Sequence, residues 1–183
     1  MLYTRKGDDG TTKTFGCDQR ISKSSAIAEA LGSLDEINSF LGLCKVVAEE
    51  TKFKLCEKRF SDIVQGVQEN LFIVQAEVAG AKKTISADKI KEIETLIDTA
   101  EKELPPIKTF FISGGTKLAA LFDVARTIAR RAERRVVFVR DEKMVKISAE
   151  TASYLNRLSS LLYALARLTN HKSGIKENSP KYE

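Results

Sequence analysis

The segment K-L-A-A-L-F-D-V-A-R-T-I-A-R-R-A-E-R-R, from Lys117 to Arg135, combines apolar and cationic residues at helical spacing. Its apolar residues recur every three or four positions, so they would line one side of a helix that starts near Gly115 and Thr116. A helix of this kind buries its apolar side against other helices. The predicted buried side consists of Leu118, Leu121, Phe122, Ala125, Ile128, Ala129 and Ala132.

Five arginines lie opposite this apolar side. A guanidinium is planar, permanently charged and rich in donors, so such an array suits a polyphosphate, for example a triphosphate. The alternative is a solvated helix face held by ion pairs four residues apart, and this segment alone does not decide between them. One face carries Arg126, Arg130, Glu133 and Arg134, while Arg131 and Arg135 lie about a quarter-turn round the helix.

Four other stretches show the same helical period, so we predict an all-α fold, an antiparallel bundle of five helices with short connections. Ser86 is a possible N-cap, and Pro105 and Pro106 end the helix that follows it. Strand-like alternation is confined to Val136–Val139, which we expect to end the arginine-bearing helix. The other apolar stripes run from Ile27 to Cys44, from Leu55 to Val78, from Ile90 to Ala100 and, in a helix from about Ser148, from Ala152 to Ala166.

The chain has 183 residues, of which 43% are hydrophobic, and no Pro-, Gly- or Ser-rich linker divides it. We therefore expect a single domain over residues 1–183, with an N-terminal loop (1–24), a helical bundle (25–170) and a loose C-terminal tail (171–183). The net charge of +5 is small and concentrated. This favours a charged pocket over a broad nucleic-acid surface.

The three cysteines, Cys17, Cys44 and Cys56, are odd in number and lack C-x-x-C spacing. Neither a disulfide framework nor a zinc site is indicated, and the reducing cytoplasm is the expected location. The first ten residues lack the apolar core of a secretory signal, and no apolar run approaches the roughly 18 residues of a membrane span. We expect no membrane contact.

The stretch T-R-K-G-D-D-G-T-T-K, from Thr4 to Lys13, has almost nothing to bury. Its glycines, hydroxyls and cations are the ingredients of a phosphate cradle, although it is not a Walker A sequence; a flexible tail is the alternative. A second glycine pair lies in T-F-F-I-S-G-G-T, from Thr109 to Thr116, and could simply be a helix-entry turn.

Polar residues interrupt two of the helical stripes. Asp35 and Glu36 do so in the first helix, and an exposed outer face would explain them. A buried arginine face would instead need an anionic partner such as Asp35 to offset its desolvation. The last helix carries Asn156, Ser160, Tyr163 and Arg167 on one side.

Together these blocks resemble the PduO-type ATP:cob(I)alamin adenosyltransferases. Two departures from that family's pattern are Ser113, where proline is common, and Ser160, where aspartate is common. The resemblance covers most of the chain in order and spacing. Its motifs are Y-T-R-x-G-D-x-G-x-T (Tyr3–Thr12), A-L-G-S-L-D-E-I-N-S (Ala30–Ser39), F-I-S-G-G-T (Phe111–Thr116), A-R-T-I-A-R-R-A-E-R-R (Ala125–Arg135) and Y-L-N-R-L-S (Tyr154–Ser159).

The resemblance implies a bundle of ferritin-like topology with an ordered N-terminal loop, assembled as a homotrimer with sites between subunits. It also implies transfer of the 5′-deoxyadenosyl group of ATP to cob(I)alamin, which yields adenosylcobalamin and triphosphate. ATP would be held by Thr4, Arg5, Lys6, Gly7, Thr12, Lys13 and Lys23 of one subunit and by Arg130, Arg131, Glu133, Arg134 and Asn156 of its neighbour.

For the corrinoid, the resemblance implies an intersubunit ion pair between Asp35 and Arg126, and a wedge, Phe110, that keeps an axial ligand off cobalt. Catalytic roles would fall to these three residues and Arg130. Mg²⁺ would accompany ATP, held by phosphate oxygens rather than by assigned side chains. A reductase would supply Co(I), an adenosylcobalamin-dependent enzyme would receive the product, and neither nucleic acid nor membrane would be a partner.

Other classes of protein remain as alternatives. A ferritin-like metal carrier needs inward Glu-x-x-His pairs, and His171 is the single histidine. A nucleic-acid-binding protein would show salt-dependent binding without ATP turnover. A corrinoid carrier or nucleotide sensor would bind its ligand without forming adenosylcobalamin.

Overall fold

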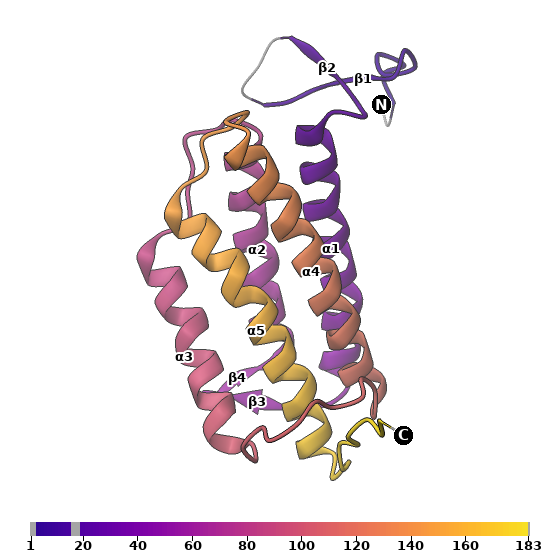
Figure 1. Ribbon diagram of the computed structural model, residues 1–183, viewed down its shortest axis with the longest axis vertical. Coiled ribbons are helices and arrows are strands. Elements are labelled where there is room, and N and C mark those ends of the chain that lie inside the picture. The colour runs from indigo at the N-terminus through magenta and orange to yellow at the C-terminus, as the bar shows by residue number, and fades with distance from the viewer. Residues whose placement is uncertain (1–2, 16–18, 183) are drawn as a thin grey trace.

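The computed structural model describes residues 3–15 and 19–182, and five long helices account for most of them (Figure 1). Each helix runs opposite to the one that precedes it in the chain. The prediction of an all-α, antiparallel five-helix bundle is confirmed. The helices are α1 (Ala26–Glu49), α2 (Phe60–Val78), α3 (Ala87–Glu103), α4 (Lys117–Asp141) and α5 (Ala149–Lys172).

The helices pack in a fixed set of pairs: α1 contacts α2 and α4, and α5 contacts α3 and α4. Since direction alternates along the chain, the neighbours α3 and α5 point the same way. The connection from α3 to α4, residues 104–116, crosses the lower end of the bundle (Figure 1). At this connection the prediction of short links between helices was wrong, and the candidate site described below is built on it.

Most helix ends follow from local chemistry. Thr116 and Ser148 cap α4 and α5, each accepting a hydrogen bond from a backbone N–H of the first turn. Ser86 occupies the predicted N-cap of α3, but its side chain makes no capping bond. Leu104 is extended because Pro105 follows it, and this ends α3 at Glu103.

The predicted second stripe began at Leu55, but α2 begins only at Phe60. Residues 54–59 instead form a hairpin in which β3 (Lys54–Leu55) pairs with β4 (Lys58–Arg59). Its two-residue turn, Cys56 and Glu57, has φ values of 50° and 60°, as a type I′ turn requires. Leu55 is buried, so its apolar character fits either structure.

The N-terminal loop is a small hairpin rather than an irregular coil. β1 (Thr11–Lys13) pairs antiparallel with β2 (Arg20–Ser22) above the start of α1 (Figure 1). At the other terminus α5 continues to Lys172, two residues beyond the predicted end of the bundle. Residues 173–182 then turn back, and Ile112 donates its backbone N–H to the Asn178 carbonyl at 2.8 Å.

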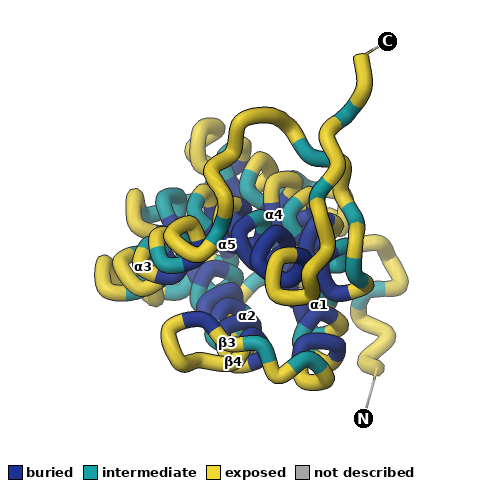
Figure 2. Tube along the Cα trace, turned by 90° about the horizontal axis from the view of Figure 1, so that it is seen from below, coloured by how far each residue is buried: buried dark blue, intermediate teal, exposed yellow. Residues whose placement is uncertain are grey.

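The core consists of apolar residues on the inner sides of the helices, where Figure 2, viewed from below, shows the buried positions. Cys44 belongs to it, and burial raises the pKa of its thiol to about 12. Cys56 is exposed, whereas Cys17 lies outside the described residues. None of the described helices combines the length and apolar character needed to cross a membrane.

Glu77 is a buried carboxylate near the end of α2. Its Oε1 accepts the Ser148 backbone N–H at 2.6 Å, and its Oε2 accepts the Thr151 hydroxyl. A negative charge at this place satisfies the N-terminal donors of α5 and interacts favourably with the helix dipole. Glu77 thereby joins the end of α2 to the start of α5.

We expect Glu77→Gln to lower the free energy of unfolding by about 2 kcal/mol, because one acceptor oxygen and the charge are lost. Urea denaturation would measure this. The matched control is Glu69→Gln, an exposed carboxylate on the same helix, which should stay within about 0.5 kcal/mol of wild type. Equal effects of the two substitutions would show that Glu77 does not stabilise the contact between α2 and the start of α5.

Candidate functional site

Two of the five arginines between Arg126 and Arg135 on α4 are paired with α1. Arg131 forms an ion pair with Glu36, and Arg135 lies 3.5 Å from Glu29. All four side chains are partly exposed. These pairs join α4 to α1, whereas the alternative interpretation of the segment expected ion pairs between residues four apart on the same helix.

Arg130 and Arg134 differ from these two arginines. Both are exposed, and within the described parts of the chain neither has an ion-pair or hydrogen-bond partner. Beside them Glu133 accepts a 3.1 Å hydrogen bond from the Asn156 amide on α5. Four of the five residues predicted to bind phosphate on this surface therefore lie together: Arg130, Glu133, Arg134 and Asn156. The two guanidiniums among them are free to bind an anion.

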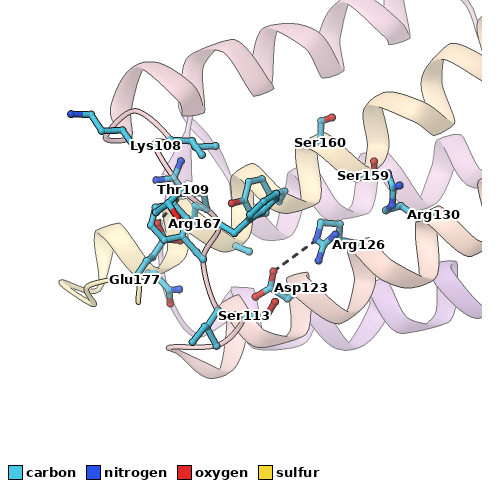
Figure 3. A pocket seen from close by; sticks show the side chains of 17 residues that line it. Lys108, Thr109, Ser113, Asp123, Arg126, Arg130, Ser159, Ser160, Arg167 and Glu177 are labelled. Atoms are coloured by element: carbon cyan, nitrogen blue, oxygen red, sulfur yellow. Dashed lines mark hydrogen bonds and ion pairs between the residues drawn. The ribbon is translucent and has the colours of Figure 1, made fainter. Parts of the chain in front are cut away.

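A cavity of about 660 Å³ opens where the 104–116 connection crosses α4 and α5 (Figure 3). Arg130 lines it, so the cavity adjoins the free arginines. Phe110 also lines it and is 78% exposed, so a large apolar side chain is available to a ligand at the cavity. Further lining comes from Ser113 on the connection, Asp123 and Arg126 on α4, and Ser159, Ser160 and Tyr163 on α5.

Asp123 and Arg126 form the polar floor of this cavity (Figure 3). The Asp123 carboxylate lies 4.0 Å from Arg126 Nε and accepts the Gly114 N–H at 3.1 Å. Burial raises the pKa of Asp123, and the Gly114 N–H and the Arg126 charge only partly oppose this shift. The Arg126 guanidinium lies 5.9 Å from the centre of the Tyr163 ring. Asp35 is exposed on α1, and its predicted pair with Arg126 of another subunit stays a prediction.

Gly114 and Gly115 form a turn that leads into α4, which is the helix-entry turn considered for this motif in the sequence. Gly114 and Gly115 have φ values of 126° and 97°, which favour glycine. A Cβ on Gly115 would lie 2.4 Å from the Asn170 side chain. Asn170 accepts the Thr116 N–H at 3.0 Å and donates to the Gly114 carbonyl at 2.8 Å, so α5 fixes the turn.

The N-terminal loop is held by its own cations. Arg20 donates to the Thr11 carbonyl at 2.9 Å, and Lys23 donates to the Gly7 carbonyl at 2.8 Å. Thr4, Arg5 and Lys6 are exposed, Gly7 and Thr12 are partly buried, and Lys13 is exposed at the end of β1. The loop lies at the opposite end of the bundle from the 104–116 connection (Figure 1). One chain therefore does not bring the loop and the cavity together.

Sequence reasoning missed Asp123 and Asn170 as site residues. Asp123 lies beside Phe122 within the apolar stripe of α4, and an acidic residue three positions before Arg126 was an available signal. Asn170 fell at the predicted boundary with the tail. Only the approach of α5 to the turn reveals its role.

The raised pKa of Asp123 has a definite effect on stability. The folded state binds this proton more tightly than the unfolded state, so the stabilisation is present at low pH and is lost as pH rises through the folded pKa. Relative to Asp123→Asn, which keeps an acceptor for Gly114, the wild type should therefore lose stability between pH 4 and pH 7. Urea denaturation at both values would test this, and a relative gain by the wild type would contradict it.

A sequence model of the family described as cobalamin adenosyltransferase matches residues 2–169. The corrinoid adenosyltransferase PduO of Citrobacter freundii is 38% identical over 177 residues, 93% of this chain and 50% of that protein. A corrinoid adenosyltransferase of Bacillus subtilis is 38% identical over 178 residues, 95% of this chain and 89% of that protein. This chain thus spans about half the length of the PduO relatives from Citrobacter freundii and Salmonella typhimurium.

Solved structures give the same result. A phenylalanine-to-histidine variant of a PduO-type ATP:corrinoid adenosyltransferase from Lactobacillus reuteri, complexed with cobalamin and ATP, matches with a TM-score of 0.88 at 28% identity. The match covers 100% of this chain and 97% of that one. Because the family model extends over nearly the whole chain, and relatives and solved structures agree with it, this chain belongs to the cobalamin adenosyltransferase family.

Proposed function

We propose that this chain transfers the 5′-deoxyadenosyl group of ATP to the cobalt of cob(I)alamin, forming adenosylcobalamin and triphosphate. One observation carries the proposal: Arg130 lines the cavity of about 660 Å³. With Arg134 it also forms an exposed pair of arginines that has no ion-pair or hydrogen-bond partner among the described residues. A polyphosphate on that face and a large apolar ligand in the cavity would then lie next to each other. Family membership supports this choice of ligands.

The reaction needs no nucleophile from the protein. The Co(I) electron pair attacks the 5′ carbon of ATP, the cobalt–carbon bond forms, and the carbon–oxygen bond breaks with its electron pair on triphosphate. Arg130 and Arg134 would stabilise the negative charge that grows on the departing triphosphate. The remaining contribution is positioning, which brings the two reacting atoms together in line.

We infer that each site lies between subunits of a homotrimer. The loop and the 104–116 connection lie at opposite ends of one chain (Figure 1), so a site that combines a nucleotide held by the loop with a corrinoid at Phe110 needs a second subunit. The same assembly would place Asp35 of one subunit against Arg126 of the next. The loop residues assigned to ATP are Thr4, Arg5, Lys6, Gly7, Thr12, Lys13 and Lys23, and Arg130, Arg131, Glu133, Arg134 and Asn156 of the neighbour complete the set.

Mg²⁺ fits as an ion carried by the nucleotide. Among the described residues no group of three or more His, Cys, Asp or Glu side chains could hold a metal. The cations around Arg130 suit a phosphate chain rather than an ion cage. Mg²⁺ would neutralise part of the phosphate charge, and the arginines would hold the rest.

Phe110 is the residue we assign to the lower face of the corrin ring. It lies on the connection, lines the cavity and is 78% exposed. An apolar ring at this place would exclude the axial donor from Co(II), which lowers the energy of the orbital that accepts an electron. Reduction to Co(I) would follow more easily. The electron would come from a separate reductase in the cytoplasm, and an adenosylcobalamin-dependent enzyme would receive the product.

The decisive experiment supplies the protein with ATP, Mg²⁺ and chemically reduced cobalamin. Formation of alkylcobalamin is followed by absorbance, and triphosphate release by anion-exchange chromatography. Stoichiometric appearance of both products supports the proposal. A folded protein that binds cobalamin or ATP but forms neither product would be a carrier or sensor, and the proposal would be wrong.

Arg130 can be tested against a matched arginine on the same helix. We expect Arg130→Ala to lower kcat by about a hundredfold, because one donor to the leaving group is lost. Arg130→Lys keeps the charge but loses the planar fork, and we expect a loss of about tenfold. The control Arg140→Lys, where the guanidinium pairs with Asp141, should remain near wild type. An Arg130→Ala rate within a factor of two of wild type would contradict the role.

Phe110→Ala tests the wedge by separating reduction from transfer. The variant should lose most activity when the assay starts from Co(II) and a weak reductant, yet keep most of it when Co(I) is supplied. Phe72→Ala, another exposed phenylalanine, serves as the control on α2. Equal losses from both starting states would show that Phe110 does not act on the cobalt ligand.

A further inference from the structure

Arg167 is a buried cation that the proposed reaction does not use. Only 5% of this residue is exposed, although it lies close to the C-terminal end of α5 (Figure 3). Removing a guanidinium from water is costly unless an opposite charge and hydrogen bonds compensate for it. The partners of Arg167 therefore indicate what this charge holds in place.

Those partners come from two separate segments. Arg167 Nε lies 2.9 Å from the Glu177 carboxylate in the C-terminal segment, and Nη2 donates to the Pro105 carbonyl at 3.2 Å. The guanidinium also lies 4.9 Å from the centre of the Phe111 ring, within the range of a cation–π contact. Arg167 thus links α5 to both ends of residues 105–111 and to the chain beyond α5.

Residues 105–112 have little other support. Arg167 and residues of the connection line two hollows of about 180 and 310 Å³, so packing around the connection is sparse. Among the described residues, the backbone of 105–112 makes two hydrogen bonds to other segments. One is the Pro105 carbonyl to Arg167, and the other is the Ile112 N–H to Asn178. Arg167 itself makes the first hydrogen bond. Asn178, which accepts the second, follows Glu177, the ion-pair partner of Arg167.

We propose that Arg167 and Glu177 are positioning residues that fix the connection so that Phe110 faces the corrinoid. This inference rests on the proposed function. Phe110 is 78% exposed, so its position depends chiefly on the backbone on either side, at Pro105 and Phe111. Glu177 acts through Arg167, because without its carboxylate the buried charge loses its counterion and the clamp loosens.

The principal variant is Glu177→Gln, because Glu177 lies outside the bundle and its loss should leave the helices intact. Glu103→Gln is the matched control: Glu103 ends α3 two residues before Pro105, and its partly exposed pair with Lys172 at 2.7 Å should contribute little to stability. The first measurement is limited trypsin digestion at the exposed Lys108. We expect Glu177→Gln to speed cleavage there at least fivefold with unchanged helical content, and Glu103→Gln to leave it unchanged.

The second measurement is a double-mutant cycle with Phe110→Ala. Glu177→Gln should lower activity from Co(II) at least tenfold and activity from Co(I) less than twofold. Added to Phe110→Ala it should cause no further loss, since both changes remove the same wedge. Electron paramagnetic resonance of bound Co(II) should show the axial nitrogen signal returning in Glu177→Gln. Arg167→Lys, which keeps a charge but fewer donors, should fall between wild type and Glu177→Gln.

The outcomes separate the two proposals. If wild type forms no adenosylcobalamin, the proposed function fails, while the digestion result still tests the clamp. If Glu177→Gln leaves Lys108 as protected as in wild type, the clamp is wrong. Equal losses from Co(II) and Co(I), or losses that multiply with Phe110→Ala, would give Glu177 a purely structural role and would also overturn the inference.

Discussion

Charged side chains that leave water must find opposite charges or hydrogen-bond partners, and this constraint organises the lower end of the bundle. Asp123 meets Arg126 and the Gly114 N–H, and Arg167 meets Glu177. The Asp123–Gly114 hydrogen bond and the Arg167–Glu177 ion pair each connect a helix to a segment without regular structure. The connection between α3 and α4 is therefore held by electrostatics at points where apolar packing is sparse.

The same constraint divides the arginines of α4 by location. Those that face α1 have carboxylate partners, and Arg126 has Asp123 beneath the cavity. Arg130 and Arg134 point where this chain offers no partner among its described residues. Unpaired guanidiniums repel one another, so their clustering costs stability that a bound anion would restore. This imbalance is the reason we propose that the face formed by Arg130 and Arg134 binds an anionic ligand.

The sequence predicted what depends on local chemistry. Helical period and capping residues located the five helices, with α4 and α5 beginning after the predicted Thr116 and Ser148. It failed where backbone geometry or distant contacts decide. Cys56 and Glu57 form a turn that Asn-Gly usually forms, so the hairpin gave no signal, and Asn170 acts on a turn 56 residues away. The paired state of Arg131 likewise required α1 to lie beside α4. The motif resemblance identified the family, which local patterns alone left open.

The hairpin lies at one end of the bundle and the connection at the other, so one chain does not place a nucleotide held by the hairpin beside a corrinoid at the connection. If they share a ligand across chains, catalytic competence is a property of the association equilibrium. Turnover per chain would then fall on dilution by mass action, and a nucleotide bridging two chains would in turn tighten their association. Cellular abundance would set the fraction of complete sites, independently of any change in the chemistry at cobalt.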